Sequence, residues 1–355
     1  MPLNILVTGA GGAVAHSIIK ALNHSALDFR LFTTSSLTWG AALYVGEKGL
    51  LVPGADDEAY IPAITHICRK CSIDVLLVGT DSEIMKLSCR REDIERDSGA
   101  KVIVGDPGTL TIGCDKWVTC EFLRENNIDY PCTVQAEDIT GVRELVEDLG
   151  FPLVVKPRSF SGSKGFIIVR DEEDLHYALL RPGGLVVQEF LQGENEEYTV
   201  CVVVSRDGSV LGSIGMKRVM HCGLTVAAVV DEFPQVQAYA EEIAQKMQPY
   251  GACNVQLRLT PRGPVCFEIN PRFSGTDGQS AAYGFNAVEA VIRNYVLGED
   301  DIDLSEYRRG FFARFWNELY VPMEGYEKFC ETGEISESGS SVIPDVLRSK
   351  SIPVA

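Results

Sequence analysis

The amino-acid sequence predicts an α/β protein whose first part is an open parallel sheet and whose later part is rich in β-hairpins. Three observations support this fold class. The chain opens with a short apolar strand, a glycine-rich turn and a helical pattern; short apolar runs then alternate with helical patterns as far as Gly105; β-rich segments follow from residue 186 to residue 270. Strands that alternate with helices form parallel sheets with helices on both faces.

The first strand, Asn4 to Thr8, runs into GAGGAVAHSIIKAL, which is typical of a Rossmann-like βα unit. Its glycines do not complete GxGxxG, because Val14 occupies the third glycine position. The second strand, FRLFTTS, ends in Thr33 and Thr34, where a nicotinamide-dinucleotide site would carry an acidic residue. We therefore expect this turn to pack a helix on the sheet or to offer backbone N–H groups to an anionic substrate.

The βα alternation continues through three further apolar runs. Thr80, Asp81 and Glu83 follow one of them directly, at the strand end where open sheets bind ligands. The favoured interpretation is a helix N-cap with an acidic first turn, and contact with a substrate is the alternative. The expected strands are 50–53, 74–79 and 101–105, and the expected helices are 57–71 and one from about Ser82.

Composition excludes several classes of protein. The net charge of −18 argues against nonspecific binding to nucleic acid or an anionic membrane, although a cleft that concentrates Lys and Arg can still bind a nucleotide. No apolar run approaches the roughly 18 residues that span a bilayer, and the first residues lack a signal peptide. The 11 cysteines form no framework, and Cys68 and Cys71 make a CxxC without a second pair. We expect a cytoplasmic protein with reduced thiols.

The stretch VCFEINPRFSGT, residues 265–276, carries the clearest chemistry. Alternation along a strand places Glu268, Asn270 and Arg272 on one face. A carboxylate beside a carboxamide suits Mg²⁺ that also binds phosphate oxygens, and an arginine suits an oxyanion. Gln256 lies on the partner strand of the predicted hairpin. The alternative is an amphipathic strand that ends in a solvated turn.

Two lysines upstream lie in positions that suit a phosphate. Lys116 occupies the first turn of a helix that Asp115 can cap, where the helix dipole disfavours a cation; a surface lysine is the alternative. Lys156 ends an apolar strand and precedes the Ser/Gly loop from Ser159 to Gly165, whose small residues allow a close approach to phosphate. The loop is no Walker A motif, and a flexible hairpin with solvated lysines is the alternative.

Other polar groups complete a candidate site. The extended segment Gln188 to Leu191 can offer backbone groups to a base, and Glu197 can accept hydrogen bonds from a ribose. Lys217, Arg218 and Arg272 are the candidates for holding a carboxylate substrate. We expect the loops near Gly9, Asp81, Lys217 and Arg314 to set specificity, and we interpret His221 as a loop residue.

The order of these parts (DK, Lys156 with its loop, QEFLxG, EY, NVQ and EINPRFSG) resembles the ATP-grasp enzymes. It is most similar to one ATP-grasp half of the carbamoyl-phosphate synthase large subunit and to stand-alone carboxylate–amine ligases related to it, from about Leu3 to Gly298. The resemblance implies an ATP-grasp fold with an α+β lid. The implied parts are a Rossmann-like pre-ATP-grasp domain (1–113), a lid with the phosphate-covering loop (114–190), a subdomain with the metal site (191–300) and a C-terminal extension (301–355).

The resemblance also implies roles for individual residues. Glu189 and the Leu191 backbone would contact adenine, Glu197 (or the adjacent Glu196) would contact ribose, and Arg272 would stabilise the transferred phosphoryl group. One or two Mg²⁺ ions, with Mn²⁺ as an alternative, would be held by Gln256, Glu268 and Asn270. The implied ATP-binding residues are Lys116, Lys156, Ser161, Gly162, Ser163, Lys164, Gly165, Glu189, Phe190, Leu191 and Glu197.

The expected activity is that of an ATP-dependent ligase. A carboxylate (an amino acid, small peptide or metabolite) would be joined to an amine through an acyl phosphate, with release of ADP and phosphate. The chain is far shorter than the synthase, which resembles two such units in tandem. A nicotinamide-dependent oxidoreductase and a noncatalytic nucleotide-binding scaffold are the alternatives. We expect small-molecule partners, a possible homodimer, no nucleic acid and no membrane. Gly310 to Val321 is expected to add a last strand, and a partner surface is the alternative.

Overall fold

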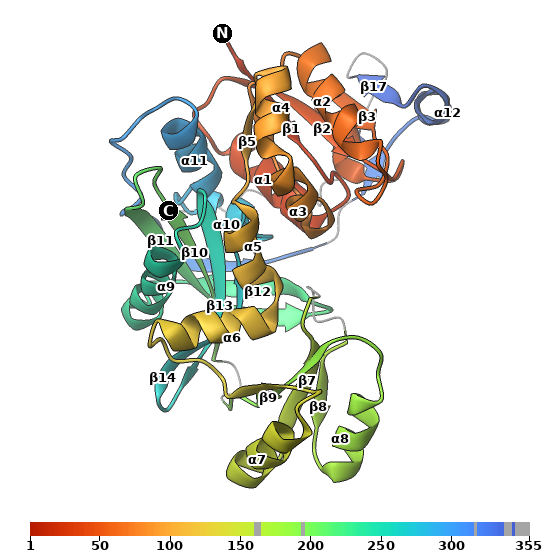
Figure 1. Ribbon diagram of the computed structural model, residues 1–355. Helices are drawn as coiled ribbons and strands as arrows, with labels where there is room; N and C mark the ends of the chain where they lie inside the picture. The colour runs from red at the N-terminus through yellow and green to blue at the C-terminus, as the bar shows by residue number, and fades with distance from the viewer. Residues whose placement is uncertain (160–164, 193–195, 316–317, 337–342, 345–355) are drawn as a thin grey trace.

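The computed structural model describes residues 1–159, 165–192, 196–315, 318–336 and 343–344. Three sheets make up most of the molecule. In Figure 1 the first sheet and its helices form the upper lobe, the largest sheet lies in the middle, and a small sheet with two helices lies below. Along the chain, helices α5 (Pro107–Cys114) and α6 (Lys116–Glu125) connect the first sheet to the small sheet.

The first sheet has the order β17-β3-β2-β1-β4-β5, and its five N-terminal strands are parallel. Alternate residues of β1 enter two separate cores: Ile5 and Val7 pack on one face of the sheet, and Leu6 packs on the other. The predicted parallel α/β sheet is therefore confirmed. Its elements are β1 (Leu3–Val7), α1 (Ala13–Asn23), β2 (Phe29–Ser35), η1 (Ala41–Tyr44), β3 (Lys48–Leu51), α2 (Tyr60–Lys70), β4 (Val75–Leu77), α3 (Asp81–Cys89), α4 (Arg91–Ser98) and β5 (Lys101–Ile103).

The C-terminal part of the chain returns to this first sheet. Strand β17 (Glu334–Ser336) pairs antiparallel with β3, and helix α12 (Met323–Thr332) precedes it, as the blue elements of Figure 1 show. Glu334 forms ion pairs with Lys48 and Lys70, each at 2.5 Å. A segment from the end of the chain thus completes the edge of the sheet that begins it.

The small sheet has the order β6-β9-β7-β8 and is antiparallel. Its apolar face packs under α7 (Ile139–Leu149) and α8 (Glu172–Leu179), and Leu153 and Val187 are fully buried there. This sheet carries Lys156 near the end of β7. Its strands are β6 (Thr133–Gln135), β7 (Leu153–Pro157), β8 (Ile167–Val169) and β9 (Leu185–Glu189).

The largest sheet has the order β14-β13-β10-β11-β12-β15 and is antiparallel throughout. Helix α9 (Pro234–Met247) covers one face, and α1, α10 (Asp277–Ala282) and α11 (Ala287–Tyr295) lie over the other. Its strands are β10 (Glu197–Val204), β11 (Val210–His221), β12 (Leu224–Val230), β13 (Ala252–Thr260), β14 (Gly263–Asn270) and β15 (Gly310–Ala313).

The expected last strand is confirmed in shorter form. Of the described residues between 310 and 321, Gly310–Ala313 join the large sheet by pairing with β12. The next strand, β16 (Leu319–Tyr320), pairs with β18 (Ile343–Pro344) instead. The three sheets occupy residues 3–103 with 334–336, 133–189 and 197–313. The division of the chain into four domains stays a prediction.

Candidate functional site

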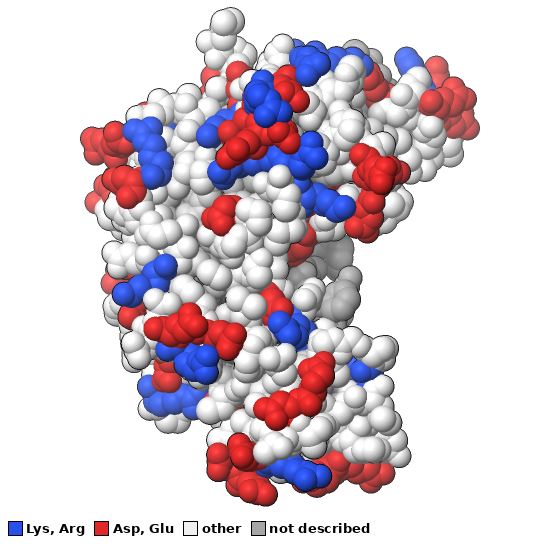
Figure 2. Space-filling model, in the orientation of Figure 1, with Lys and Arg blue, Asp and Glu red and all other residues white. Residues whose placement is uncertain are grey.

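A cavity of about 680 Å³ lies where the three sheets meet. Its lining comes from the start of α1, the β4–α3 connection, the start of α6, strands β7, β9, β10, β11, β13 and β14, and the residues after β14 and β15. Among the described lining residues six side chains are cationic and four are acidic, although the whole chain carries a net charge of −18. On the face in Figure 2 the charges of both signs are interspersed, and the surface is hollowed between the upper lobe and the small lower unit.

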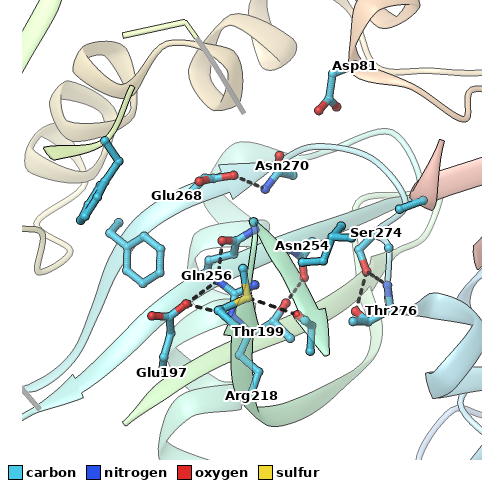
Figure 3. A pocket seen from close by; sticks show the side chains of 18 of the residues that line it. Asp81, Glu197, Thr199, Arg218, Asn254, Gln256, Glu268, Asn270, Ser274 and Thr276 are labelled. Atoms are coloured by element: carbon cyan, nitrogen blue, oxygen red, sulfur yellow. Dashed lines mark hydrogen bonds and ion pairs between the residues drawn. The ribbon is translucent and has the colours of Figure 1, made fainter. Parts of the chain in front are cut away.

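The hairpin of β13 and β14 provides the base of this cavity. Gln256 lies opposite Glu268 in the register, and Asn254 lies opposite Asn270. The Asn270 Nδ2 group donates a hydrogen bond to Glu268 Oε1 at 3.0 Å, as Figure 3 shows. Arg272 Nη2 in turn donates to Asn270 Oδ1 at 3.1 Å. The prediction that Glu268, Asn270 and Arg272 share one face is therefore confirmed.

An ion pair across the cavity joins the first sheet to the largest one. Arg272 donates through Nε and Nη2 to the two carboxylate oxygens of Asp81, with 2.9 Å for the Nη2 bond, and through Nη1 to the Phe273 carbonyl oxygen at 2.8 Å. Thr80 precedes α3, but its side chain makes no capping hydrogen bond. The favoured interpretation is otherwise confirmed, because Thr80 occupies the N-cap position and Asp81 and Glu83 lie in the first turn of α3. Thr80 and Asp81 also line the cavity.

Two lysines from different elements reach the same part of the cavity. The Asp115 side chain accepts from the N–H groups of Trp117 and Val118, so the predicted cap is confirmed and Lys116 occupies the first turn of α6. Lys156 on β7 is only 7% exposed, and its Nζ lies 3.4 Å from the Phe267 carbonyl oxygen.

Burial and mutual repulsion both act on this lysine pair. Burial and, to a smaller extent, the charge of Lys116 lower the pKa of Lys156 to about 8, whereas Glu268 opposes the shift. Burial also lowers the pKa of Lys116, again opposed by Glu268. Two desolvated ammonium groups of like charge destabilise each other, and a bound oxyanion removes that cost for both. The geometry therefore suits a phosphate group that contacts both Lys116 and Lys156 in the part of the cavity where Glu268 lies.

The end of β9 forms an apolar section of the cavity. Glu189, Phe190 and Leu191 all line it, together with Phe267 from β14. The Glu189 carboxylate accepts from the Arg262 Nη1 and Nη2 groups at 2.7 and 2.8 Å and from the Cys132 N–H group at 3.1 Å. Since its carboxylate is held in this way, the contact that Glu189 offers to a ligand is through its backbone.

A second ion cluster lies beside the Mg²⁺ candidates. Glu197 accepts from Arg218 at 2.8 and 3.0 Å and from Arg258 at 3.0 Å, while Arg218 Nη2 also donates to Gln256 Oε1 at 2.7 Å. Figure 3 shows Glu197, Arg218 and Gln256 directed toward one another. Of the two adjacent glutamates only Glu197 lines the cavity, since Glu196 binds Lys217 at 2.6 Å.

Lys217 is the predicted site residue that the structure places elsewhere. It is absent from the described lining of the cavity and forms its ion pair with Glu196. The physical reason is strand alternation, because neighbouring residues on β11 point to opposite faces of the sheet and Arg218 is the one that faces the cavity. Gly165 also lies outside the described lining, and Ser161, Gly162, Ser163 and Lys164 fall outside the described residues.

The remaining predicted residues come together, and the cavity adds others. Arg314, Ser274 and the Thr199–Asn254 pair line it without having been named as ligand-binding residues. Arg314 was expected only as part of a specificity loop. The predicted site residues in the lining are Lys116, Lys156, Glu189, Phe190, Leu191, Glu197, Arg218, Gln256, Glu268, Asn270 and Arg272.

The donor set suits a magnesium ion that shares its ligands with a nucleotide. Within the described part of the chain no three His, Cys, Asp or Glu side chains gather as a metal cage. Mg²⁺ commonly takes one or two carboxylates and completes its shell with phosphate oxygens and water, so Glu268 with Asn270 fits this ion. The amide oxygens of Gln256 and Asn270 each accept a hydrogen bond from an arginine, Arg218 at 2.7 Å and Arg272 at 3.1 Å, so the Glu268 carboxylate is the stronger candidate ligand.

Two family models match the chain. Residues 182–317 match a model described as ATP-grasp in the biosynthetic pathway with Ter operon, and residues 5–103 match the PylC-like N-terminal domain. Among curated proteins, the carbamoyl phosphate synthase large chain of Saccharolobus islandicus (strain L.S.2.15 / Lassen #1) is 26% identical over 280 residues. That match covers 72% of this chain and 26% of the relative, so the chain spans about a quarter of the relative's length.

Solved structures share the fold. The ADP complex of N5-carboxyaminoimidazole ribonucleotide synthetase superposes with a TM-score of 0.70 at 15% identity, over 93% of this chain and 85% of that one. The biotin carboxylase domain of Hydrogenobacter thermophilus 2-oxoglutarate carboxylase, solved with Mg-ADP and bicarbonate, gives 0.67 at 17% identity, over 87% and 73%. The chain therefore has the ATP-grasp fold, and its residues 5–103 match the PylC-like N-terminal domain.

Two expectations can be compared with these findings: the oxidoreductase alternative and the absence of a membrane-spanning segment. The family matches and the fold do not support the nicotinamide-dependent oxidoreductase. In the part of the chain that the structure describes, helices long and apolar enough to cross a bilayer are absent.

Proposed function

We propose that this chain is an ATP-dependent carboxylate–amine ligase that uses Mg-ATP. The observation that carries the proposal is the cluster of Lys116, Lys156 and Glu268, which places two desolvated cations and a carboxylate at one point of the cavity. Because the curated relatives are much longer than this chain, their activity supports the reaction class and leaves the substrates open.

In this proposal the nucleotide lies between the small and the largest sheet. Two features support this position. The apolar section at Phe190, Leu191 and Phe267 suits adenine, and Glu197 suits ribose. Lys116 and Lys156 hold the phosphates. The expected contribution of Ser161, Gly162, Ser163 and Lys164 lies outside the described residues. Glu268 and Asn270 hold Mg²⁺, or Mn²⁺ as an alternative ion, which neutralises charge on the phosphates when bound.

The reaction needs positioning and charge stabilisation more than a protein nucleophile. A carboxylate oxygen of the first substrate attacks the γ-phosphorus, and the bond to the ADP oxygen breaks. The amine nitrogen then attacks the acyl carbon, phosphate leaves with the bonding electrons, and the nitrogen loses a proton. Arg272, held by Asp81, is placed to stabilise the transferred phosphoryl group, since it adjoins Asn270.

Substrates and surroundings follow from the same chemistry. We propose small-molecule substrates, with a homodimer as a possible assembly. All 11 cysteines are free thiols, which supports a reducing, cytoplasmic location.

A coupled assay of phosphate and ADP release tests the proposal. Full-length protein, Mg²⁺ and ATP are mixed with pools of amino acids and small carboxylates, with and without pooled amines. Release that depends on both pools supports the ligase. Tight binding of ATP without release in any pool favours the noncatalytic scaffold, and absence of ATP binding contradicts both interpretations.

A further inference from the structure

Arg314 follows the last strand of the large sheet and reaches into the cavity. Its backbone N–H donates to the Val226 carbonyl oxygen at 2.7 Å, which fixes the residue against β12. The guanidinium Nη2 donates to the Gly275 carbonyl oxygen and lies 3.5 Å from Gln279 Oε1. Its Nε is buried and has no hydrogen-bond partner among the described residues. A buried, unsatisfied donor on a charged group costs free energy unless a ligand accepts its hydrogen.

Arg314 differs from the other arginines of the cavity in its ion pairing. Four arginines line it among the described residues. Arg218 and Arg258 share the carboxylate of Glu197, and Arg272 pairs with Asp81. Arg314 makes no ion pair with a described carboxylate; its partners are a carbonyl oxygen and an amide. Among the four arginines, Arg314 is therefore the one without a carboxylate partner in the described part of the chain.

The surroundings of Arg314 add to the positive potential. Gly12, Ala13 and Val14, at the start of the 11-residue helix α1, line the cavity, and the first turn of α1 contains no acidic residue. The partial positive charge of a helix N-terminus attracts anions. Burial lowers the pKa of His16 on the same helix, and the charges of Lys20 and Arg314 lower it further.

Asp277, at the start of α10, is an acidic side chain that binds the turn preceding it and not Arg314. Asp277 is fully buried and accepts from the Ser274 N–H and hydroxyl groups at 2.7 and 3.0 Å. Ser274 and Thr276 themselves line the cavity, with their hydroxyl oxygens 2.7 Å apart. In the view of Figure 3 they lie on the opposite side of Asn270 from Glu268. The Arg314 end is thus separate from the proposed metal position.

We propose that Arg314 is the specificity-determining residue of the ligase and binds an oxyanion group, a carboxylate or a phosphate monoester, of the substrate that enters beside the start of α1. The inference rests on the proposed function, because it places this substrate next to a bound nucleotide. It assigns to Arg314 the substrate-holding role that Lys217 cannot fill and that Arg218 shares with Glu197. The favoured substrates then carry an oxyanion at this end of the molecule, and neutral analogues bind weakly.

Calorimetry on the full chain tests the proposal. The protein is first saturated with Mg²⁺ and the non-hydrolysable ATP analogue AMPPNP. Acetate, succinate, inorganic phosphate and glycerol 3-phosphate are then titrated separately, so that the first two report carboxylate recognition and the last two report phosphate recognition. The variants are Arg314→Gln and, as a matched control, Arg309→Gln; Arg309 is exposed, pairs with Asp231 at 3.2 Å and lies outside the described lining.

The expected result is that at least one anion binds the wild type and Arg309→Gln equally, and binds Arg314→Gln roughly 10- to 100-fold more weakly, as expected for a lost charge-assisted hydrogen bond. Equal affinity for wild type and Arg314→Gln overturns the proposal, and so does a wild type that binds none of the four anions. If Arg314→Gln does not fold, Arg314→Lys replaces it, with weakening expected because lysine lacks the bidentate fork.

The AMPPNP titration keeps the two proposals apart. Wild type that does not bind Mg-AMPPNP contradicts the proposed function, and the anions are then titrated without nucleotide, with the same comparison of variants. Normal AMPPNP affinity together with anion binding that ignores Arg314 overturns this inference alone.

Discussion

Lys156 shows how one buried side chain couples the nucleotide to pH. Its pKa of about 8 lies near neutrality because burial disfavours the charged form. A phosphate needs the charged form, so binding draws a proton onto Lys156 when the pH exceeds that pKa. The affinity for Mg-AMPPNP should therefore fall by roughly tenfold between pH 7.0 and pH 9.5, measured by calorimetry.

The control for this prediction is Lys156→Arg, which keeps its charge throughout the range. We expect the pH dependence of its affinity to be much smaller than that of the wild type. Equal slopes for both proteins would show that another group, such as Lys116, causes the dependence.

At the residue scale, local patterns predicted some positions and not others. The spacing of Glu268, Asn270 and Arg272 follows from strand alternation, which is a property of the local chain. The same rule places Lys217 and Arg218 on opposite faces of β11, so it would have excluded one of the two from the candidate site. The pairing of Arg272 with Asp81 joins residues 191 positions apart, and no local pattern carries such a contact. Arg314 was expected within a specificity loop, but its lack of a carboxylate partner among the described residues depends on the whole cavity and was not predicted.

At the scale of elements, helix α5 sets the position of the metal-bearing strand end. A Cβ atom at Gly113 would meet the Pro271 ring and lie 2.8 Å from the Ile269 carbonyl oxygen. Gly113→Ala gains up to about 1 kcal/mol of helix propensity, but the collision forces β14 away from α5. We expect a net destabilisation of about 1–2 kcal/mol in urea unfolding and weaker nucleotide binding, because Asn270 and Arg272 flank the displaced proline.

Gly54→Ala is the matched control for this change, since a Cβ atom at Gly54 meets nothing within 4 Å. Its stability should stay within about 0.5 kcal/mol of the wild type. A Gly113→Ala protein as stable as Gly54→Ala would mean that α5 and β14 adjust independently.

Hairpins and βα units were predictable as elements because each depends on neighbouring residues. The β13–β14 hairpin places Gln256 opposite Glu268 as expected. The register shift between Gln256 and Leu257 was not predicted. Strand ends also differ, as at β3, which begins at Lys48 and ends at Leu51.

At the scale of the molecule, the C-terminal strand β17 ties the end of the chain to its beginning. Hydrogen bonds from Lys48 and Lys70 lower the pKa of Glu334 below its usual value. The contribution to stability is therefore present above the unfolded pKa and is lost as the pH falls through the lower folded pKa. Since Glu334 is 37% exposed, solvent screening limits that contribution to about 1 kcal/mol or less.

Urea unfolding of Glu334→Gln checks this prediction. At pH 7 the variant should be slightly less stable than the wild type, and at pH 3 the difference should shrink markedly. A difference that persists unchanged at pH 3 would show that the lost contact acts through packing of β17 and not through charge.

The fold class was predictable from the order of the elements, and the assembly of the cavity was not. A chain with a net charge of −18 collects an excess of positive side chains in one place, and they come from helix α6, the small sheet, and the strands and strand ends of the largest sheet. The sequence order of motifs identifies which residues take part. Their mutual distances, and the two carboxylates that pair with three of the four arginines, arise only from tertiary packing.

The central claim is that Glu268 carries the metal that binds the nucleotide phosphates. Its most direct test is the affinity for AMPPNP, measured by calorimetry with Mg²⁺ and with EDTA, for wild type and Glu268→Gln. The account predicts that Mg²⁺ tightens binding to the wild type by tenfold or more, on the scale of a charge-assisted contact, and that Glu268→Gln loses most of this gain while it folds normally. A Glu268→Gln protein that keeps the full Mg²⁺-dependent gain would contradict it.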